Sequence, residues 1–379
     1  MSNRKLKNVL ITGGAGFIGS NFIHYLFNES ASGSKEFKDS GFTGNVVNLD
    51  LLTYAGNLEN LSDIEAKYGT GVSEAERRYH FIKGDICDRK LIEDIFNKYD
   101  IDTVVHFAAE SHVDRSVLEP EAFIKTNVLG TYTLLDVAKT YWKCSLDNIR
   151  DDVLFHHIST DEVYGSLGPT GYFTETTPYD PRSPYSSSKA SSDHIVMAYH
   201  HTFGLPITLS NCTNNYGPYQ FPEKLIPLMI LNISQGKNLP VYGAGTNIRD
   251  WIYVEDHNRA VFQILKDGKC GEKYNIGGEN EWQNIVLLDK LIELTSKELN
   301  IDINKVKETI THVKDRPGHD LRYAIDCSKI KKELNWERKM TFEEGLLLTV
   351  KWNLSNKEWI NHIQSGEYLN WINNNYSSR

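Results

Sequence analysis

Cysteine is scarce in this chain, and its spacing excludes two common uses of the residue. The 379 residues contain 5 cysteines, an odd number, and none of them forms a Cys-x-x-Cys pair. The spacing favours reduced, structural thiols over a disulfide framework or a zinc site. The 13 histidines include no His-Glu-x-x-His motif, so we expect no metal centre.

Long apolar runs and an excess of positive charge are missing too. No stretch approaches the length of a membrane span, and no apolar signal segment opens the chain. Lysine and arginine number 41 against 50 aspartates and glutamates, a net charge of −9 that argues against a protein coating nucleic acid. We therefore expect a cytoplasmic protein whose partners include neither a membrane nor a nucleic acid.

The first half of the chain alternates short apolar runs with helical patterns. Runs such as KNVLITG, NVVNLD and DTVVHFAAE are rich in β-branched residues, and a helical pattern follows each. This alternation predicts an α/β fold, a Rossmann-like doubly wound parallel sheet with helices on both faces. Polar stretches over 30–44 and 67–77 have loop composition and are expected to be surface insertions.

The pattern loosens after residue 210 into a stretch rich in proline, glycine and aromatic residues. Such composition predicts irregular structure around a pocket, and hence a smaller α/β substrate-binding domain. A strand-then-helix pattern returns near residue 246. We therefore expect interleaved domains, with residues 1–210 and 246–272 in the Rossmann domain and residues 211–245 and 273–379 in the substrate-binding domain.

A glycine motif marks a candidate dinucleotide site. ITGGAGFIGS places Gly13, Gly16 and Gly19 directly after the first predicted strand, where a helix must begin. Such a turn lets the backbone approach a pyrophosphate, whose charge the free N–H groups and the helix dipole stabilise. A glycine-rich turn is often no more than a turn, but its place in a βαβ pattern favours dinucleotide binding.

The second predicted strand ends in Asp50. A carboxylate there accepts both ribose hydroxyls of an adenosine and repels a 2′-phosphate, which favours NAD over NADP; the alternative is a solvated turn acid. The insertion over 30–44 explains why Asp50 lies more than ~20 residues beyond the last glycine. Two further strand ends, GDICD and FAAES, are expected at the same edge of the sheet.

Two motifs supply candidate reacting groups. SPYSSSKAS places Tyr185 and Lys189 on one face of a predicted helix, where the ammonium group is expected to lower the pKa of the tyrosine from roughly 10 and make it a base. HISTDEVYG places Asp161 and Glu162 side by side at the end of an apolar run. The alternatives are an ordinary Tyr/Lys pair and an acid pair that caps a turn.

These stretches, with LTYAGNLENL, NNYGPYQFPEKLIP, IRDWIYVEDH, YNIGG and DRPGHDLRYAID, cover nearly the whole chain. Together they resemble the extended short-chain dehydrogenase/reductase family, and within it the dTDP-glucose 4,6-dehydratases. The resemblance implies a homodimeric lyase of nucleotide-sugar metabolism, in dTDP-rhamnose biosynthesis. Its expected substrate is dTDP-glucose and its product dTDP-4-keto-6-deoxy-glucose, formed by C4 oxidation, C5/C6 water elimination and C6 reduction with bound NAD.

The resemblance also implies residue roles. Glu162 matches the base that removes the C5 proton, Asp161 the acid that protonates the C6 hydroxyl, and Thr160 the group that bonds the C4 hydroxyl beside Tyr185. The implied cofactor residues are Gly13, Gly16, Phe17, Ile18, Gly19, Asp50, Thr53, Asp85, Ile86, Ala108, Ala109, Ser111, Thr126, Tyr185, Lys189 and Asn214. The implied substrate residues are Ser111, Thr160, Asn214, Glu223, Lys224, Leu225, Arg249, Asn284, Asp315, Arg316 and His319.

Two alternatives stay open at this point. A 4-epimerase, or a 4,6-dehydratase for another nucleotide-hexose, would keep the same fold, although an epimerase needs neither Asp161 nor Glu162. A hypothesis of another class is a non-catalytic NAD-binding sensor. A matched acid, base and tyrosine argue against it, because a sensor has no use for them.

Overall fold

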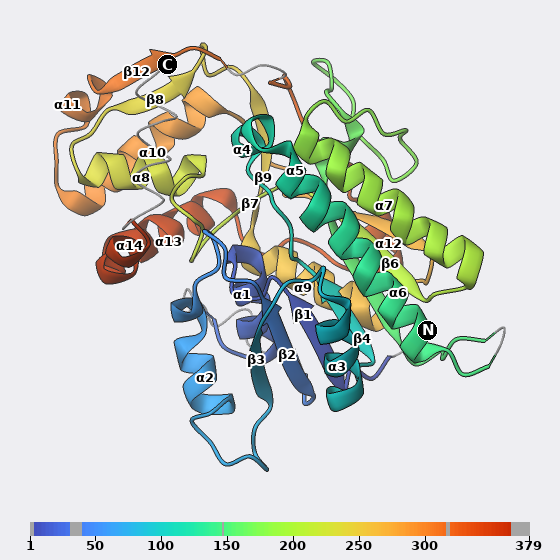
Figure 1. The fold of residues 1–379 in the computed structure, drawn as a ribbon. Helices are drawn as coiled ribbons and strands as arrows, with labels where there is room; N and C mark the ends of the chain where they lie inside the picture. Colours follow the sequence, from blue (N-terminus) through green and yellow to red (C-terminus); the bar gives the residue numbers. More distant parts are fainter. Residues whose placement is uncertain (1–3, 31–39, 146–147, 316–318, 365–379) are drawn as a thin grey trace.

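The computed structural model describes residues 4–30, 40–145, 148–315 and 319–364 (Figure 1). The predicted substrate residue Arg316, most of the insertion over 30–44 and the end of the chain from residue 365 lie outside the described residues. In the part of the chain that the structure describes, no helix is long and apolar enough to cross a membrane.

A seven-stranded parallel sheet forms the larger part of the molecule, and this confirms the predicted fold class. Its strand order is β10-β6-β5-β4-β1-β2-β3, so the order reverses between β1 and β4. In open α/β sheets, ligands bind outside the carboxyl ends of the strands at such a reversal. The strands are β1 (Asn8–Thr12), β2 (Asn45–Asp50), β3 (Tyr79–Lys83), β4 (Thr103–His106), β5 (Leu154–Thr160), β6 (Ile207–Cys212) and β10 (Glu272–Ile276).

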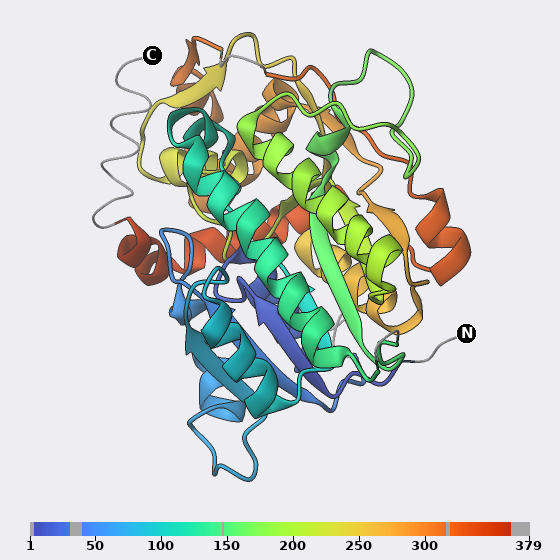
Figure 2. The same ribbon diagram turned by 45° about the vertical axis from the view of Figure 1, so that its right-hand side comes forward.

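Helices cover both faces of the sheet because its central strands are apolar on both sides. In β1, Val9 and Ile11 pack into one core with α1 (Phe17–Leu26) and α9 (Val254–Asp267). Leu10 faces the other core with α3 (Arg89–Tyr99), α6 (Thr131–Trp142) and α7 (Pro184–Phe203). Both views show α6 and α7 side by side over this face (Figure 2).

Helix α7, the long helix beside the Rossmann sheet, has a well-defined start and end. A capping box formed by Ser183 and Ser186 begins α7, and Gly204 with φ +68° ends it, which defines the helix that carries Tyr185 and Lys189. The remaining helices of this part are η1 (Leu58–Leu61), α2 (Ser62–Tyr68), α4 (Val113–Leu118), α5 (Pro120–Phe123), the π-helical η2 (Ile124–Gly130) and η3 (Asp161–Tyr164).

A second, smaller lobe lies beyond the carboxyl ends of the strands (Figure 1). Its helices are α8 (Leu225–Ser234), α10 (Asn284–Leu299), α11 (Ile303–Lys307), α13 (Phe342–Ser355) and α14 (Lys357–Ile363). β8 (Leu239–Tyr242) pairs with β12 (Ile310–Val313), and β9 (Ile248–Tyr253) lies between β7 (Asn214–Tyr216) and β11 (Glu281–Gln283).

The chain crosses between the two parts more often than the predicted boundaries allow. Within residues 246–272, β9 joins the small three-stranded sheet, and only α9 returns to pack on α1. β10 begins at residue 272 and α12 (Ser328–Leu334) packs on it, so both belong with the Rossmann sheet instead of the second segment. The short run EKYNI has little β-branched character, and the sequence pattern therefore missed this strand.

Candidate active site

The glycine turn after β1 leaves no room for side chains. Gly13 has φ +72°, and a Cβ built on it would lie 2.7 Å from the backbone N and Cα of Ala108 at the end of β4. A Cβ on Gly19 would lie 2.4 Å from the carbonyl oxygen of Gly13. The first turn of α1 is thereby held against the ends of β1 and β4, with its N-terminus open toward the pocket, as a pyrophosphate requires.

Asp50, the last residue of β2, fixes the loops on either side of it. Its Oδ2 accepts from the N–H of Ala15 at 2.9 Å, and its Oδ1 accepts from the N–H of Leu52 at 2.8 Å. Burial raises the pKa of Asp50, and the two N–H bonds oppose that rise. Because each carboxylate oxygen has a second lone pair, the group can still accept two ribose hydroxyls.

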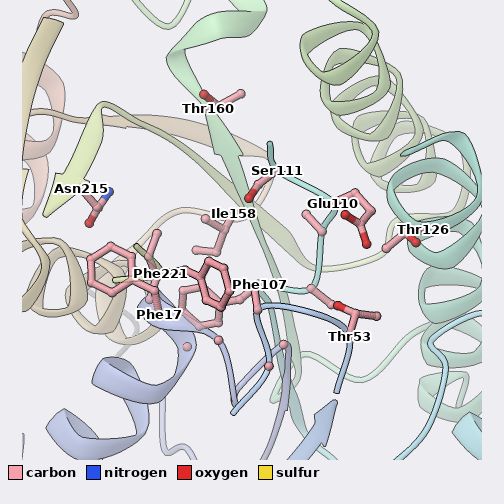
Figure 3. Close-up of a pocket in the computed structure, with 18 of the residues that line it drawn as sticks. Phe17, Thr53, Phe107, Glu110, Ser111, Thr126, Ile158, Thr160, Asn215 and Phe221 are labelled. Carbon is pink, nitrogen blue, oxygen red and sulfur yellow. The ribbon is translucent and has the colours of Figure 1, made fainter. Parts of the chain in front are cut away.

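One pocket unites the predicted cofactor and catalytic residues (Figure 3). All sixteen residues predicted to bind the cofactor line it, and so do Thr160, Asp161 and Glu162. Figure 3 shows Thr160 at the end of its strand and Ser111 and Glu110 on the loop that follows β4. Several other residues that were not predicted as site residues also line it: Leu51, Tyr54, Gly56, Phe107, Glu110, Ile158, Ser159, Cys212, Thr213, Asn215, Gln220 and Phe221.

The acid pair stands on η3, the short helix that follows β5. Thr160 caps it, since its Oγ1 accepts from the N–H of Glu162 at 3.3 Å and donates to Oδ1 of Asp161 at 3.3 Å. Asp161 is 2% exposed, and its Oδ2 has no hydrogen-bond partner among the described residues. Burial, and then the charge of Glu162, raise the pKa of Asp161 well above its ordinary range. Asp161 is therefore suited to hold a proton beside its neighbour.

The Tyr185/Lys189 pair corrects one expectation. Burial raises the pKa of Tyr185 well above its ordinary value; Glu162 adds to the rise, while a hydrogen bond with Thr160 lowers it. Nζ of Lys189 donates to the carbonyl oxygen of Ile158 at 2.7 Å, and burial lowers the pKa of Lys189 to about 8. The expected lowering of the tyrosine pKa was wrong for this structure, because burial disfavours the charged phenolate.

Residues from both parts of the molecule meet at the mouth of the pocket. Oε1 of Glu223 accepts from the hydroxyl of Tyr54 at 3.1 Å, and the guanidinium of Arg115 lies 3.7 Å from the centre of the Tyr54 ring. Nζ of Lys224, the residue that precedes α8, donates to the carbonyl oxygen of Ser111 at 3.3 Å. These contacts join the loop after β2 and the start of α8 across the pocket.

The other predicted substrate residues that the structure describes do not line this pocket. The guanidinium of Arg249 donates to the carbonyl oxygens of Ile248 at 2.7 Å and Asp320 at 3.0 Å, although its charge still lowers the pKa of Asp161. In the same lobe, but not on the pocket surface, are Leu225 at the start of α8, Asn284 at the start of α10, and Asp315 and His319, whose side chains are 2.6 Å apart. Their role in binding substrate stays a prediction.

Within the described ranges no group of three or more His, Cys, Asp or Glu side chains is arranged to hold a metal ion. The glycine turn, the strand-end carboxylate and the buried tyrosine and lysine on one helix together define a nucleotide-dependent enzyme of the extended short-chain dehydrogenase/reductase fold. The family model described as GDP-mannose 4,6 dehydratase matches residues 10–349, and the chain belongs to this family.

Among the individual proteins that the chain resembles are several dTDP-glucose 4,6-dehydratases. The chain is 51% identical to the dTDP-glucose 4,6-dehydratase of Salmonella typhimurium, over 98% of this chain and 99% of that one. Its fold is similar to that of the dTDP-glucose 4,6-dehydratase from Streptomyces venezuelae, solved with NAD and TYD bound (TM-score 0.80, 41% identity, 94% and 99% of the two chains). It is also similar to that enzyme from Bacillus anthracis, solved with NAD (TM-score 0.79, 44% identity, 94% and 99%).

Proposed function

We propose that the protein is an NAD-dependent dTDP-glucose 4,6-dehydratase, a lyase that converts dTDP-glucose to dTDP-4-keto-6-deoxy-glucose and water. The supporting observation is the acid pair. Asp161 is buried with an unbonded carboxyl oxygen, and Glu162 adjoins it in the same pocket as Tyr185. A 4-epimerase has no water to eliminate and needs neither acid. The full-length relatives that act on dTDP-glucose favour that substrate over another nucleotide-hexose.

The residues present fit NAD. The turn containing Gly13, Gly16 and Gly19 offers its N–H groups to the pyrophosphate, Asp50 accepts from the adenosine ribose, and Tyr185 and Lys189 face the reacting end of the pocket. When bound there, NAD supplies a hydride acceptor for C4 of the hexose and a hydride donor for C6, so that the reaction consumes no net oxidant.

The chain's own side chains move the protons. Tyr185, hydrogen-bonded to Thr160, acts in its phenolate form, which the positive charges of Lys189 and of oxidised NAD favour against the cost of burial. It accepts the proton of the C4 hydroxyl as that carbon becomes a ketone. The ketone acidifies the C5 hydrogen, which Glu162 removes. Asp161 gives its proton to the C6 hydroxyl, which leaves as water, and Glu162 returns its proton to C5 when C6 is reduced. The proton that Tyr185 gained replaces the one that Asp161 lost, so the protons balance.

A product assay with matched variants tests this proposal. Purified protein is incubated with dTDP-glucose without added NAD, and the 4-keto-6-deoxy product is followed by its ultraviolet absorbance in alkali. We expect turnover by the unaltered protein and losses of at least about 100-fold in Asp161→Asn and Glu162→Gln. Asp152→Asn is the control, because Asp152 is a surface acid with its side chain 52% exposed and bound to Arg150.

Three results would redirect the proposal. Product from another nucleotide-hexose alone would change the substrate. A C4-inverted sugar with no loss of water would indicate an epimerase. Bound NAD without turnover of any nucleotide-sugar would favour a sensor.

We also propose that the protein is a homodimer in the cytoplasm. Large apolar side chains are exposed on α4, η2 and the start of α6, beside α7: Val117, Leu118, Ile124, Leu129 and Tyr132. A cluster of exposed apolar side chains on a soluble fold marks a protein interface. All 5 cysteines are free thiols, which suits a reducing compartment.

A further inference from the structure

Two buried side chains that do not line the pocket, those of His157 and Asp193, lie beside Lys189. Nε2 of His157 lies 3.4 Å from Nζ of Lys189 and 3.2 Å from Oδ1 of Asp193, one helical turn along α7 from the lysine. Oδ2 of Asp193 accepts from Oγ of Ser159 and from the hydroxyl of Tyr179, both at 2.8 Å. The side chains of His157 and Asp193 are 0% and 1% exposed.

Burying the carboxylate of Asp193 costs free energy that a residue with a packing role alone would not need to spend. Burying a carboxylate costs several kcal/mol unless it is well paired. One oxygen of Asp193 receives two hydroxyl donors, whereas Oδ1 has no hydrogen bond of good geometry within the described chain and lies against His157. A neutral Asn with the same shape would avoid most of the cost. The buried charge therefore indicates a role beyond packing.

The charges identify that role. Burial and the nearby Lys189 hold the pKa of His157 well below its ordinary range, so the imidazole is neutral. Burial lowers the pKa of Lys189, and the charge of Asp193 is the largest opposing cause. The negative charge of the carboxylate therefore supports the positive ammonium group directly, across the neutral ring that lies between them.

We propose that Asp193 is a positioning residue for the dehydratase reaction, and that its negative charge, one turn along the same helix and beside His157, keeps the ammonium group of Lys189 charged and in place at the cofactor pocket. The proposal rests on the proposed function. Within the described residues, the other hydrogen bond of the Lys189 ammonium group goes to the carbonyl oxygen of Ile158. The titratable or charged groups that face this lysine and its aspartate are His106 on β4, His157 on β5, Tyr164 on η3, Tyr179 after η3, Cys212 on β6 and Lys273 on β10.

The pH dependence of cofactor binding tests the proposal without requiring turnover. Protein stripped of bound nucleotide is titrated with NADH from pH 6 to 10 by fluorescence, and kcat for dTDP-glucose is measured over the same range. We expect the affinity of the unaltered protein for NADH to fall as pH rises through the lysine pKa, about 8. Asp193→Asn should move this fall, and the alkaline limb of kcat, down by about 1 pH unit or more.

Two matched variants separate charge from structure. Tyr179→Phe removes a neutral hydrogen bond from the same carboxylate and should keep the pH profile of the unaltered protein, whatever its melting temperature. Asp193→Glu keeps the charge and should restore that profile. If Asp193→Asn folds poorly, Asp193→Ser carries the same expectation.

An NADH profile that does not shift in the neutral variant would overturn the proposal, as would equal weakening at every pH. Failure of the unaltered protein to turn over dTDP-glucose would defeat the proposed function instead. The NADH titration would still decide the role of Asp193.

Discussion

Asp161 and Glu162 occupy consecutive positions of one short helix but have different surroundings. Asp161 is 2% exposed with a raised pKa, whereas Glu162 is half-buried and shares the pocket with Tyr185. The helical turn directs neighbouring side chains to different sides of the backbone, so one acid can stay protonated while the other is ionised. This division is what an elimination that needs both an acid and a base requires.

Asp161→Asn should stabilise the protein while it abolishes turnover. Because the folded pKa of Asp161 is raised, the folded state binds this proton more tightly than the unfolded state, and its stability falls as pH rises from about 4 through the raised pKa. At pH 8 we expect the variant to gain about 1–3 kcal/mol in free energy of unfolding by urea. The gain should shrink toward pH 4, and a destabilised variant at pH 8 would contradict the account.

Thr160→Val should impair the reaction more than the fold. The hydroxyl of Thr160 bonds Tyr185 and Oδ1 of Asp161, and valine keeps its shape without these bonds. We expect kcat to fall by at least about tenfold, equivalent to ~1.4 kcal/mol. Thr160→Ser keeps the hydroxyl and should stay within a few-fold of the unaltered protein. Equal losses in both variants would show that the hydroxyl group alone does not account for the effect.

Gly13→Ala should remove NAD binding, because the added methyl group meets the backbone of Ala108 at 2.7 Å and the residue has φ +72°. We expect NADH affinity, measured by fluorescence titration, to fall at least about tenfold from strain of about 1–3 kcal/mol. Gly168→Ala is the matched control, since nothing lies within 4 Å of its Cβ position. Unchanged affinity in Gly13→Ala would place the dinucleotide elsewhere.

Leu118→Glu should dissociate the proposed dimer. Leu118 is 70% exposed on α4, and a charge buried at an apolar interface is strongly unfavourable. Light scattering should show the mass of one chain for this variant and of two for Leu321→Glu, a leucine 51% exposed in another part of the molecule. A dimeric Leu118→Glu protein would exclude α4 from the interface.

The pocket residues that lie at the ends of strands were the easiest to predict from the sequence. Gly13, Asp50, Asp85 and Ala108 end or follow parallel strands, and the doubly wound sheet brings such ends to one edge whatever the loops do. The Tyr185/Lys189 pair was equally accessible, because a helix fixes its i, i+4 spacing.

Two aspects could not be predicted from the sequence. The surroundings of Tyr54, Gln220 and Phe221 depend on how two irregular loops meet, and no motif marks them. The pKa of Tyr185 depends on burial, which spacing does not reveal. The resemblance implied that Arg249 binds the substrate. The sequence did not show that backbone carbonyl oxygens hold its guanidinium group.

Isotope tracing with dTDP-[4-²H]glucose tests the central claim most directly. The protein is incubated with this substrate in ordinary water without added NAD, and the product is analysed by mass spectrometry and NMR. The prediction is a 4-keto-6-deoxy sugar that carries the deuterium at C6. Loss of the deuterium to solvent, or its retention at C4 of an inverted hexose, would contradict it.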